Sequence, residues 1–180
     1  MNSTTRWITA GTGLSVGMAT GLAIKRARGR TARPETIPFV DLERYQGRWF
    51  EIARYPTRFE RRCARNTAAQ YTLVDGKIRV VNTCTTEDGD VLVTRGWASV
   101  ADPETNSKLR VRFGAFARGD YWILDLASDY SVAVVGDRKR RYLWILSRTP
   151  ELDEHTFARI CDNLPVLGYD PARLRRTLQE

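Results

Sequence analysis

Alternation of apolar and polar residues at a spacing of two, broken at short intervals by turn residues, constrains the fold of residues 47–147 more than any other feature. In Lys108–Phe113 the basic side chains fall on one face and the apolar ones on the other. Asp75-Gly76, between two such runs, is the strongest short-range signal of a β-hairpin. Eight segments are expected to be strands: Gly47–Tyr55, Thr67–Val74, Lys77–Thr83, Asp90–Val100, Lys108–Phe113, Tyr121–Ala127, Ser131–Gly136 and Arg141–Ser147.

Eight sequential strands with short connections fit an antiparallel up-and-down barrel, which is wide enough to hold one small ligand. A β-sandwich is the alternative, but it normally needs long Greek-key connections that this chain lacks. After the last strand, Thr149 is expected to cap an α-helix with Pro150 at its first position. The predicted fold class is therefore all-β, an eight-stranded up-and-down barrel with a C-terminal α-helix.

The N-terminal tail has features of a targeting or membrane-anchoring segment. Residues 7–24 contain no charge and could just cross a bilayer as a helix, although glycine, serine and threonine make them weakly apolar. They also resemble the apolar region of a secretory signal, whereas the basic residues that follow oppose translocation. We expect residues 1–24 to be a signal-like or membrane-anchor segment, 25–38 a basic linker and 39–180 the folded domain. Export to the cell envelope (periplasm or outer membrane) is favoured; an inner-membrane anchor and a soluble tail are the alternatives.

The net charge of +8 is concentrated in this tail. Residues 1–40 hold six basic residues and one acidic residue, a net +5, which leaves +3 for the other 140 residues. Nucleic-acid-binding proteins usually carry their basic stripe on the folded body. We therefore expect no nucleic-acid partner, and we expect the basic tail to meet a membrane surface.

Few residues offer catalytic or metal chemistry. His155 is the single histidine, and the three cysteines form no C-x-x-C pair, so common zinc and thioredoxin motifs are absent. We predict no catalytic residue, no metal and no cofactor, and hence no enzyme. Cys63 and Cys84 flank the Asp75-Gly76 hairpin, so a disulfide between them is as well supported as two free thiols, while Cys161 is left over.

Three motifs resemble those of the lipocalin family. Gly47-Arg48-Trp49 resembles its Gly-x-Trp motif on the first strand, and Ser128-Asp129-Tyr130 resembles its turn between the sixth and seventh strands. Tyr142–Pro150 resembles the third motif, which ends in an arginine before the helix. The likeness covers residues 39–180 and is closest to bacterial outer-membrane and apolipoprotein D-like lipocalins. A bacterial lipoprotein would need a cysteine at its cleavage point, and this chain has none before Cys63.

The resemblance implies structural and ligand-binding roles. Trp49 would close one end of the barrel with Arg148 lying across its indole, and Gly47 would let the chain pass close by. Strand alternation, fixed at Trp49 and Arg148 or taken from the resemblance, predicts the ligand-lining side chains. They are Ala69, Tyr71, Val80, Asn82, Ala98, Phe113, Tyr121, Ile123, Val132, Val134, Tyr142 and Trp144. The same alternation predicts that Thr94, Gly96 and Asp125 face inward. It predicts an outward orientation for Arg95, Trp97, Trp122 and Leu124.

This mostly apolar lining suits an elongated apolar molecule. The expected function is binding, transport or storage of a small hydrophobic ligand, such as a fatty acid or lysophospholipid, in support of membrane maintenance. Arginines after the first strand would either pair with an anionic headgroup at the mouth or form a solvated loop: Arg58, Arg61, Arg62 and Arg65. The alternatives are a packed barrel, a ligand-free membrane-associated scaffold, and a lipocalin-type enzyme acting on a lipid through a pocket thiol, for which no cysteine lies on the predicted inner face.

Overall fold

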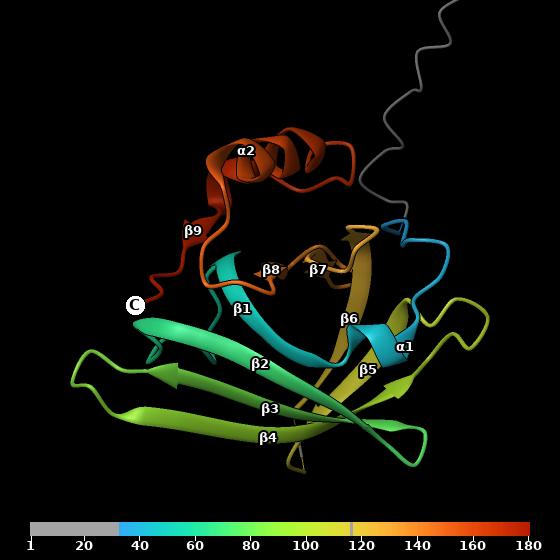
Figure 1. The fold of residues 1–180 in the computed structure, drawn as a ribbon, viewed down its shortest axis with the longest axis horizontal. Helices are drawn as coiled ribbons and strands as arrows, with labels where there is room; N and C mark the ends of the chain where they lie inside the picture. Colours follow the sequence, from blue (N-terminus) through green and yellow to red (C-terminus); the bar gives the residue numbers. More distant parts are fainter. Residues whose placement is uncertain (1–32, 116) are drawn as a thin grey trace, which may run out of the picture.

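The structure is a computed structural model that describes residues 33–115 and 117–180 (Figure 1). Its barrel strands are β1 (Gly47–Arg54), β2 (Arg65–Val74), β3 (Lys77–Thr85), β4 (Val91–Val100), β5 (Lys108–Phe113), β6 (Ala117–Leu126), β7 (Val132–Gly136) and β8 (Leu143–Ser147). Each pairs antiparallel with the next, and β1 pairs with both β8 and β2, which closes the barrel. The predicted eight-stranded barrel is thereby confirmed.

The two ends of the barrel differ. At the closed end lies α1 (Leu42–Tyr45), which Asp41 caps by accepting hydrogen bonds from two backbone amides. At the open end lie the β1–β2, β3–β4, β5–β6 and β7–β8 connections, because β1 runs from the closed end to the open end and the strands alternate in direction. The longest open-end connection, residues 55–64, therefore lies at the mouth.

The barrel has hydrophobic residues packed on both sides of its wall. An inner cluster fills the closed half and includes Trp49, Tyr71 and Leu109. An outer cluster lies under α2 (Glu154–Asn163), which crosses the outside of the barrel (Figure 1). Trp122 and Leu124 belong to this outer cluster, as predicted.

The C-terminal tail completes the wall. After α2 come η1 (Pro171–Arg173) and β9 (Arg175–Arg176), and β9 pairs with the open-end half of β1. Leu178 then bridges to Arg65 of β2. Direct pairing of β1 with β2 covers only Gly47–Phe50, so the tail fills the seam where these two strands separate.

Two sequence expectations on element bounds need correction. The helix begins at Glu154 with Asp153 as its N-cap, not at Thr149, because the Asp153 carboxylate accepts from the Thr156 amide at 2.8 Å. The end of the expected linker is packed on the barrel: Pro34 is buried and the Ile37 amide donates to the Ile123 carbonyl at 3.2 Å.

A further correction concerns which residues face inward on β6 and β7. The β6–β7 register shifts between Ile123 and Asp125, which turns Asp125 to the outer wall opposite Val134. On β7 the inward residues are Ala133 and Val135, whereas Val132 and Val134 pack in the outer cluster. The expectation that Asp125, Val132 and Val134 face inward is therefore wrong.

The uncharged tail segment 7–24 lies outside the described residues, as does most of the basic linker. Within residues 33–115 and 117–180, no helix combines the length and the hydropathy needed to span a bilayer.

Candidate ligand site in the barrel

The closed end is built around Trp49 and Arg148. Trp49 is fully buried, and its indole N–H donates to the Tyr45 carbonyl at 2.9 Å. The Arg148 guanidinium carbon lies 4.0 Å from the centroid of the Trp49 ring, a cation–π geometry. The guanidinium also donates to three backbone carbonyls, those of Arg44, Arg48 and Tyr130.

Gly47 is required beside this arginine. Its φ of +97° is a conformation that side chains with a Cβ rarely adopt, and a Cβ there would lie 3.0 Å from an Arg148 nitrogen. The three residues that the sequence singled out for the closed end thus lie together. Since Arg148 is bonded to the backbone and stacked on Trp49, it belongs to the floor of the barrel.

Above this floor, three tyrosines meet inside the barrel. The hydroxyls of Tyr45 and Tyr121 are 2.7 Å apart, and the Tyr71 ring lies within 6 Å of both other rings. Burial raises the pKa of all three phenols, that of Tyr71 to about 12, so they stay neutral and serve as hydrogen-bonding groups. The pocket beside them measures only about 10 Å³, so the closed half of the barrel is nearly filled.

Small residues do not all leave room inside. A Cβ on Gly96 would lie 2.5 Å from the Phe113 ring and 2.5 Å from the Arg112 carbonyl oxygen. The space that the missing side chain leaves is taken up by Phe113. Gly96 thus faces inward, as expected, but does not widen the interior.

The open half is accessible to solvent. Asn82, Phe113, Tyr142 and Trp144 are half-buried, and Thr94, which lies opposite Asn82, is exposed. Strand register directs Asn82, Thr94, Phe113 and Trp144 into the barrel, so solvent reaches the last three through the mouth. The amide oxygen of Asn82 is buried there without a hydrogen-bond partner.

Aromatic side chains gather at the mouth. Tyr142 stacks against Trp144 with 5.8 Å between ring centroids. Phe59, on the β1–β2 connection, lies 5.6 Å from Tyr142 and 6.4 Å from Trp144. The Phe59 side chain is 64% exposed, so it offers an apolar surface to solvent at the entrance.

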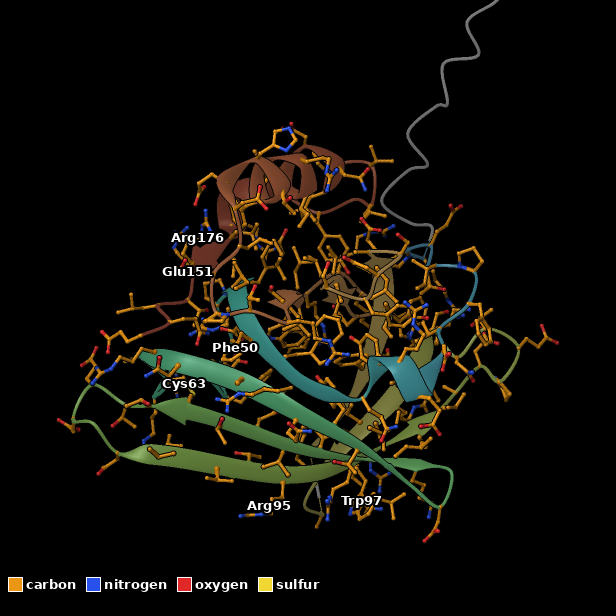
Figure 2. All side chains as sticks on the ribbon, viewed as in Figure 1. Phe50, Cys63, Arg95, Trp97, Glu151 and Arg176 are labelled. Atoms are coloured by element: carbon orange, nitrogen blue, oxygen red, sulfur yellow. A yellow bond between two sulfur atoms is a disulfide. The ribbon has the colours of Figure 1, made fainter. Side chains whose placement is uncertain are left out.

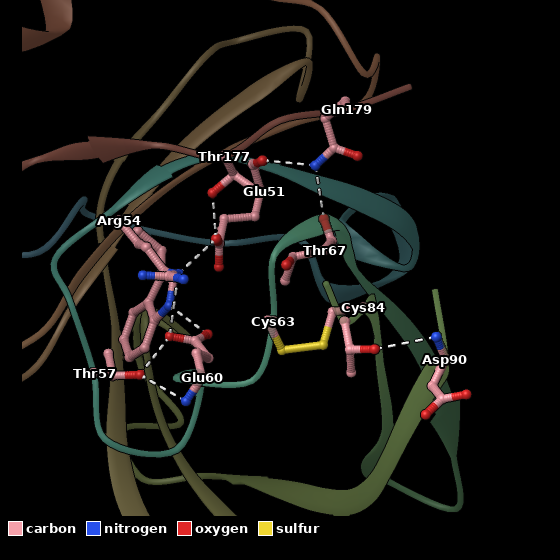
Figure 3. Close-up of a disulfide and its surroundings, with 12 residues drawn as sticks. Glu51, Arg54, Thr57, Glu60, Cys63, Thr67, Cys84, Asp90, Thr177 and Gln179 are labelled. Carbon is pink, nitrogen blue, oxygen red and sulfur yellow. Dashed lines mark hydrogen bonds and ion pairs between the residues drawn. A yellow bond between two sulfur atoms is a disulfide. The ribbon is translucent and has the colours of Figure 1, made fainter. Parts of the chain in front are cut away.

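A charged cluster lies in the inner wall below this mouth (Figure 3). Glu51 lies opposite Leu146 and Arg54 opposite Trp144, both inward-facing residues of β8. The Arg54 Nε atom is 3.0 Å from the Glu51 carboxylate and 3.6 Å from that of Glu60.

Side chains from three other segments complete this cluster. Trp144 donates its indole N–H to Glu60 at 3.2 Å, Thr57 donates to Glu60 at 2.6 Å, and Thr177 donates to Glu51 at 2.5 Å. Burial, reinforced by the neighbouring Glu60, raises the pKa of the Glu51 carboxyl to about 8. The wall is thus less uniformly apolar than predicted.

A disulfide ties the mouth loop to the wall. Cys63 and Cys84 are bonded, with 5.5 Å between their Cα atoms, which settles the question that the sequence left open (Figure 3). The bond anchors the connection that carries Phe59 and Glu60 to β3. Cys161 is a free, half-buried thiol on α2, outside the barrel.

The arginines expected at the mouth divide into two groups. Arg58, Arg61 and Arg62 are exposed on the β1–β2 connection, as a headgroup contact would require. Arg65 instead pairs with Glu180 at 3.0 Å and belongs to the seam.

The residues predicted to line the ligand site also fall into two groups, those inside the barrel or at its mouth and those on the outer wall. Apart from Val132 and Val134, the structure places them inside or at the mouth: Ala69, Tyr71, Val80, Ala98, Phe113, Tyr121, Ile123 and Trp144 in the inner cluster, Asn82 on the same face as Val80, and Tyr142 on Trp144. Their contact with a ligand stays a prediction.

The sequence reasoning missed five residues of the site, which are Tyr45, Glu51, Arg54, Phe59 and Glu60. Alternation from Trp49 could have found Glu51, but Tyr45 and the two loop residues lie outside the alternating segments. Within the described ranges, no His, Cys, Asp or Glu residues form a group of three that could hold a metal ion.

The sequence matches the family model described as a lipocalin-like domain over residues 40–179. Temperature-induced lipocalin-1 of Arabidopsis thaliana is 39% identical over 154 residues, which cover 81% of this chain and 82% of that protein. Outer membrane lipoprotein Blc of Escherichia coli K12 is 37% identical over 134 residues, which cover 74% of this chain and 76% of that protein.

A solved structure agrees with the fold. The cockroach allergen Per a 4 superposes with a TM-score of 0.65 at 20% identity, over 83% of this chain and 95% of that one. This similarity supports the barrel architecture and says nothing further about the ligand.

Proposed function

Because the chain belongs to the lipocalin family, we propose that its barrel binds a small hydrophobic molecule that enters through the open end. The observation that carries this proposal is the solvent access to inward-facing side chains in the open half, beside a buried amide oxygen of Asn82 that has no hydrogen-bond partner. Trp144, Phe113 and Asn82 combine apolar surface with a few polar atoms, which is the usual composition of a ligand pocket.

The ligand we favour is an amphiphile with one acyl chain, such as a fatty acid or a lysophospholipid. The chain would lie in the open half against Phe113 and Trp144, and it would end above the tyrosines because the space beside them is only about 10 Å³. Its polar end would remain at the mouth, where Arg58, Arg61 and Arg62 are exposed. Each buried methylene would contribute about 0.8 kcal/mol.

Binding, transport or storage fits these features better than catalysis. The carboxyl groups of Glu51 and Glu60 are occupied by Arg54, Thr57 and Thr177, and the free thiol Cys161 lies outside the barrel. An enzyme acting on a lipid through a pocket thiol would need a free cysteine on the inner wall, whereas Cys84, on the same face of β3 as Asn82, is bonded to Cys63.

We place the protein in the cell envelope, in support of membrane maintenance. An outer membrane lipoprotein is among its relatives, which favours this location. The uncharged segment 7–24 would supply contact with the membrane, either as a cleaved signal or as an anchor.

A fluorescent fatty acid, dansyl-labelled undecanoic acid, tests the proposal. It should bind saturably with one molecule per chain, and oleate or a lysophospholipid should displace it. Thr94→Trp would place an indole in the open half and should weaken binding at least tenfold. Val93→Trp, one residue away on the outer face, is the matched control and should bind as the wild type does. Equal affinity in both variants, with unchanged melting temperatures, would contradict the assignment of the interior as the site.

A further inference from the structure

The outer face of the sheet carries a row of cations around one exposed indole. Strand register places Arg79 of β3 opposite Trp97 of β4, Trp97 opposite Arg112 of β5, and Arg112 opposite Arg118 of β6. All four side chains are exposed, Trp97 by 47%. Arg95, two residues from Trp97 on the same strand, points to the same side (Figure 2). We call these five residues the Trp97 face.

The arginines of this face lack carboxylate partners. Among the residues that the structure describes, Arg79, Arg95, Arg112 and Arg118 form no ion pair; Arg112 donates only to the Gly114 carbonyl at 3.2 Å. The nearest carboxylate in the adjacent row, Asp120, is 3.5 Å from Arg138. Arg112 and Arg118 lie directly opposite each other, and like charges in such pairs destabilise a sheet. An anionic partner would relieve this repulsion.

Apolar side chains accompany the cations. Val91 and Val93 lie on the same face of β4 as Trp97 and are 66% and 43% exposed. Indole rings and the aliphatic stems of arginine are suited to the boundary between water and lipid, where an apolar body and a polar tip are both satisfied.

We propose that the Trp97 face docks on the surface of an anionic lipid bilayer. The face runs along β4, which begins at the open end, so docking would hold the mouth of the barrel close to the lipid. The β3–β4 loop at that end carries Glu87, Asp88 and Asp90, and anionic lipid repels these carboxylates. The contact is therefore made by the middle of β4 and its neighbours, and the loop stays in water.

The same cations could attract a nucleic acid, and the apolar neighbours favour the membrane. Proteins that bind single strands stack successive bases on several aromatic rings. Here Trp97 is the single aromatic residue in the row, and its apolar neighbours on β4 are valines. Aliphatic side chains gain from lipid and gain little from bases.

Vesicle flotation of the full-length chain tests this docking. Vesicles of phosphatidylcholine with one quarter phosphatidylglycerol should bind the wild type, and pure phosphatidylcholine vesicles should bind it far less. The triple variant R79Q/R112Q/R118Q should partition about 100-fold more weakly, since each basic residue near an anionic surface contributes roughly fivefold. The variant R48Q/K139Q/R159Q removes the same charge from exposed positions outside this face and is the control. The tail is present in every protein, so its contribution is common to all of them.

A second measurement follows the indole. Brominated lipids should quench part of the tryptophan fluorescence of the wild type, and Trp97→Phe should remove that part. Equal vesicle affinity in the two triple variants would overturn the proposal. Binding of a single-stranded oligonucleotide that R79Q/R112Q/R118Q abolishes, with vesicle binding unchanged, would also overturn it and assign the face to nucleic acid.

Docking on vesicles does not depend on the ligand in the barrel. Binding of dansyl-labelled undecanoic acid in solution, without vesicles, should be the same in R79Q/R112Q/R118Q and in the wild type. A failure of the docking surface and a failure of the ligand site are therefore distinguishable.

Discussion

Thr177 donates a 2.5 Å hydrogen bond to the carboxyl group of Glu51, which lies 126 residues earlier in the chain. Gln179 adds two further bonds from the same tail, to the carbonyls of Glu51 and Thr67. Glu51 in the inner wall is thus held by the segment that follows η1. Its environment forms only when the two ends of the domain meet.

The first prediction concerns pH. The pKa of Glu51 is raised to about 8, above its value of about 4.5 in an unfolded chain, so the folded state holds a proton that the unfolded state releases between these values. The free energy of unfolding should therefore fall as pH rises from about 5 to 8. Glu51→Gln should reduce the fall in unfolding free energy across this range by more than about 1 kcal/mol, the energy of one pKa unit. Urea unfolding at several pH values measures this free energy, and Glu104→Gln, at an exposed site, is the control. An identical pH dependence for Glu51→Gln and the wild type would refute the raised pKa of Glu51.

Arg148→Ala should destabilise the floor of the barrel. The substitution removes the cation–π contact with Trp49 and leaves three backbone carbonyls without their donor. We expect a loss of about 1–3 kcal/mol, the usual range for a lost cation–π contact together with hydrogen bonds from a charged donor. Binding of the dansyl-labelled fatty acid should change little, since Arg148 lies beneath the tyrosines. A large loss of affinity at unchanged stability would instead place Arg148 in the ligand site.

Gly96→Ala should destabilise the protein, because its Cβ would lie 2.5 Å from the Arg112 carbonyl oxygen and from the Phe113 ring. Overpacking of this kind costs about 1–3 kcal/mol. Gly119→Ala is the matched control, since its Cβ would meet only Val111, at an ordinary 3.6 Å. Thermal melts of both variants decide the point; a neutral Gly96→Ala would show that Phe113 and the β5 backbone move freely.

Loss of the disulfide should loosen the mouth. The bond joins residues 21 apart in sequence, and closing a loop of this length contributes about 3 kcal/mol. The double variant Cys63→Ser/Cys84→Ser should unfold at lower urea concentration, and proteolysis should become faster in residues 55–64. Cys161→Ser, which leaves the bond intact, should behave as the wild type in both assays. Thiol counting without reductant should give one free cysteine in the wild type; three would contradict the bond.

Sequence alternation predicted the inner face well on strands that have one buried side. On β5 and β4 the polar face meets solvent, so Phe113 and Ala98 could be distinguished from Arg112 and Trp97. On β7 both faces are buried, one inside the barrel and one under α2, so the sequence reads as a continuous apolar run without usable alternation. Val132 and Val134 were therefore placed on the wrong side.

Other features had no local signal. The bulge at Ile123 to Asp125 inverts the pattern of β6 within two residues, and the polar tail that includes Thr177 and Gln179 shows no periodicity. Its role in the wall depends on the gap between β1 and β2, which arises from the closure of the whole barrel. The motifs at Trp49 and Arg148 located the floor because that arrangement uses few residues at fixed positions.

The position of the last residues in the wall has a consequence for how the protein is made. Glu180 donates its backbone N–H to Asn66, so the seam between β1 and β2 is sealed only after the segment that follows α2 has been synthesised. Until then an incomplete barrel would present an open sheet edge, and such edges invite aggregation. A purification tag fused after Glu180 would begin beside the seam, where it could disturb the closure of the barrel. A tag placed before the N-terminal segment would not affect this closure.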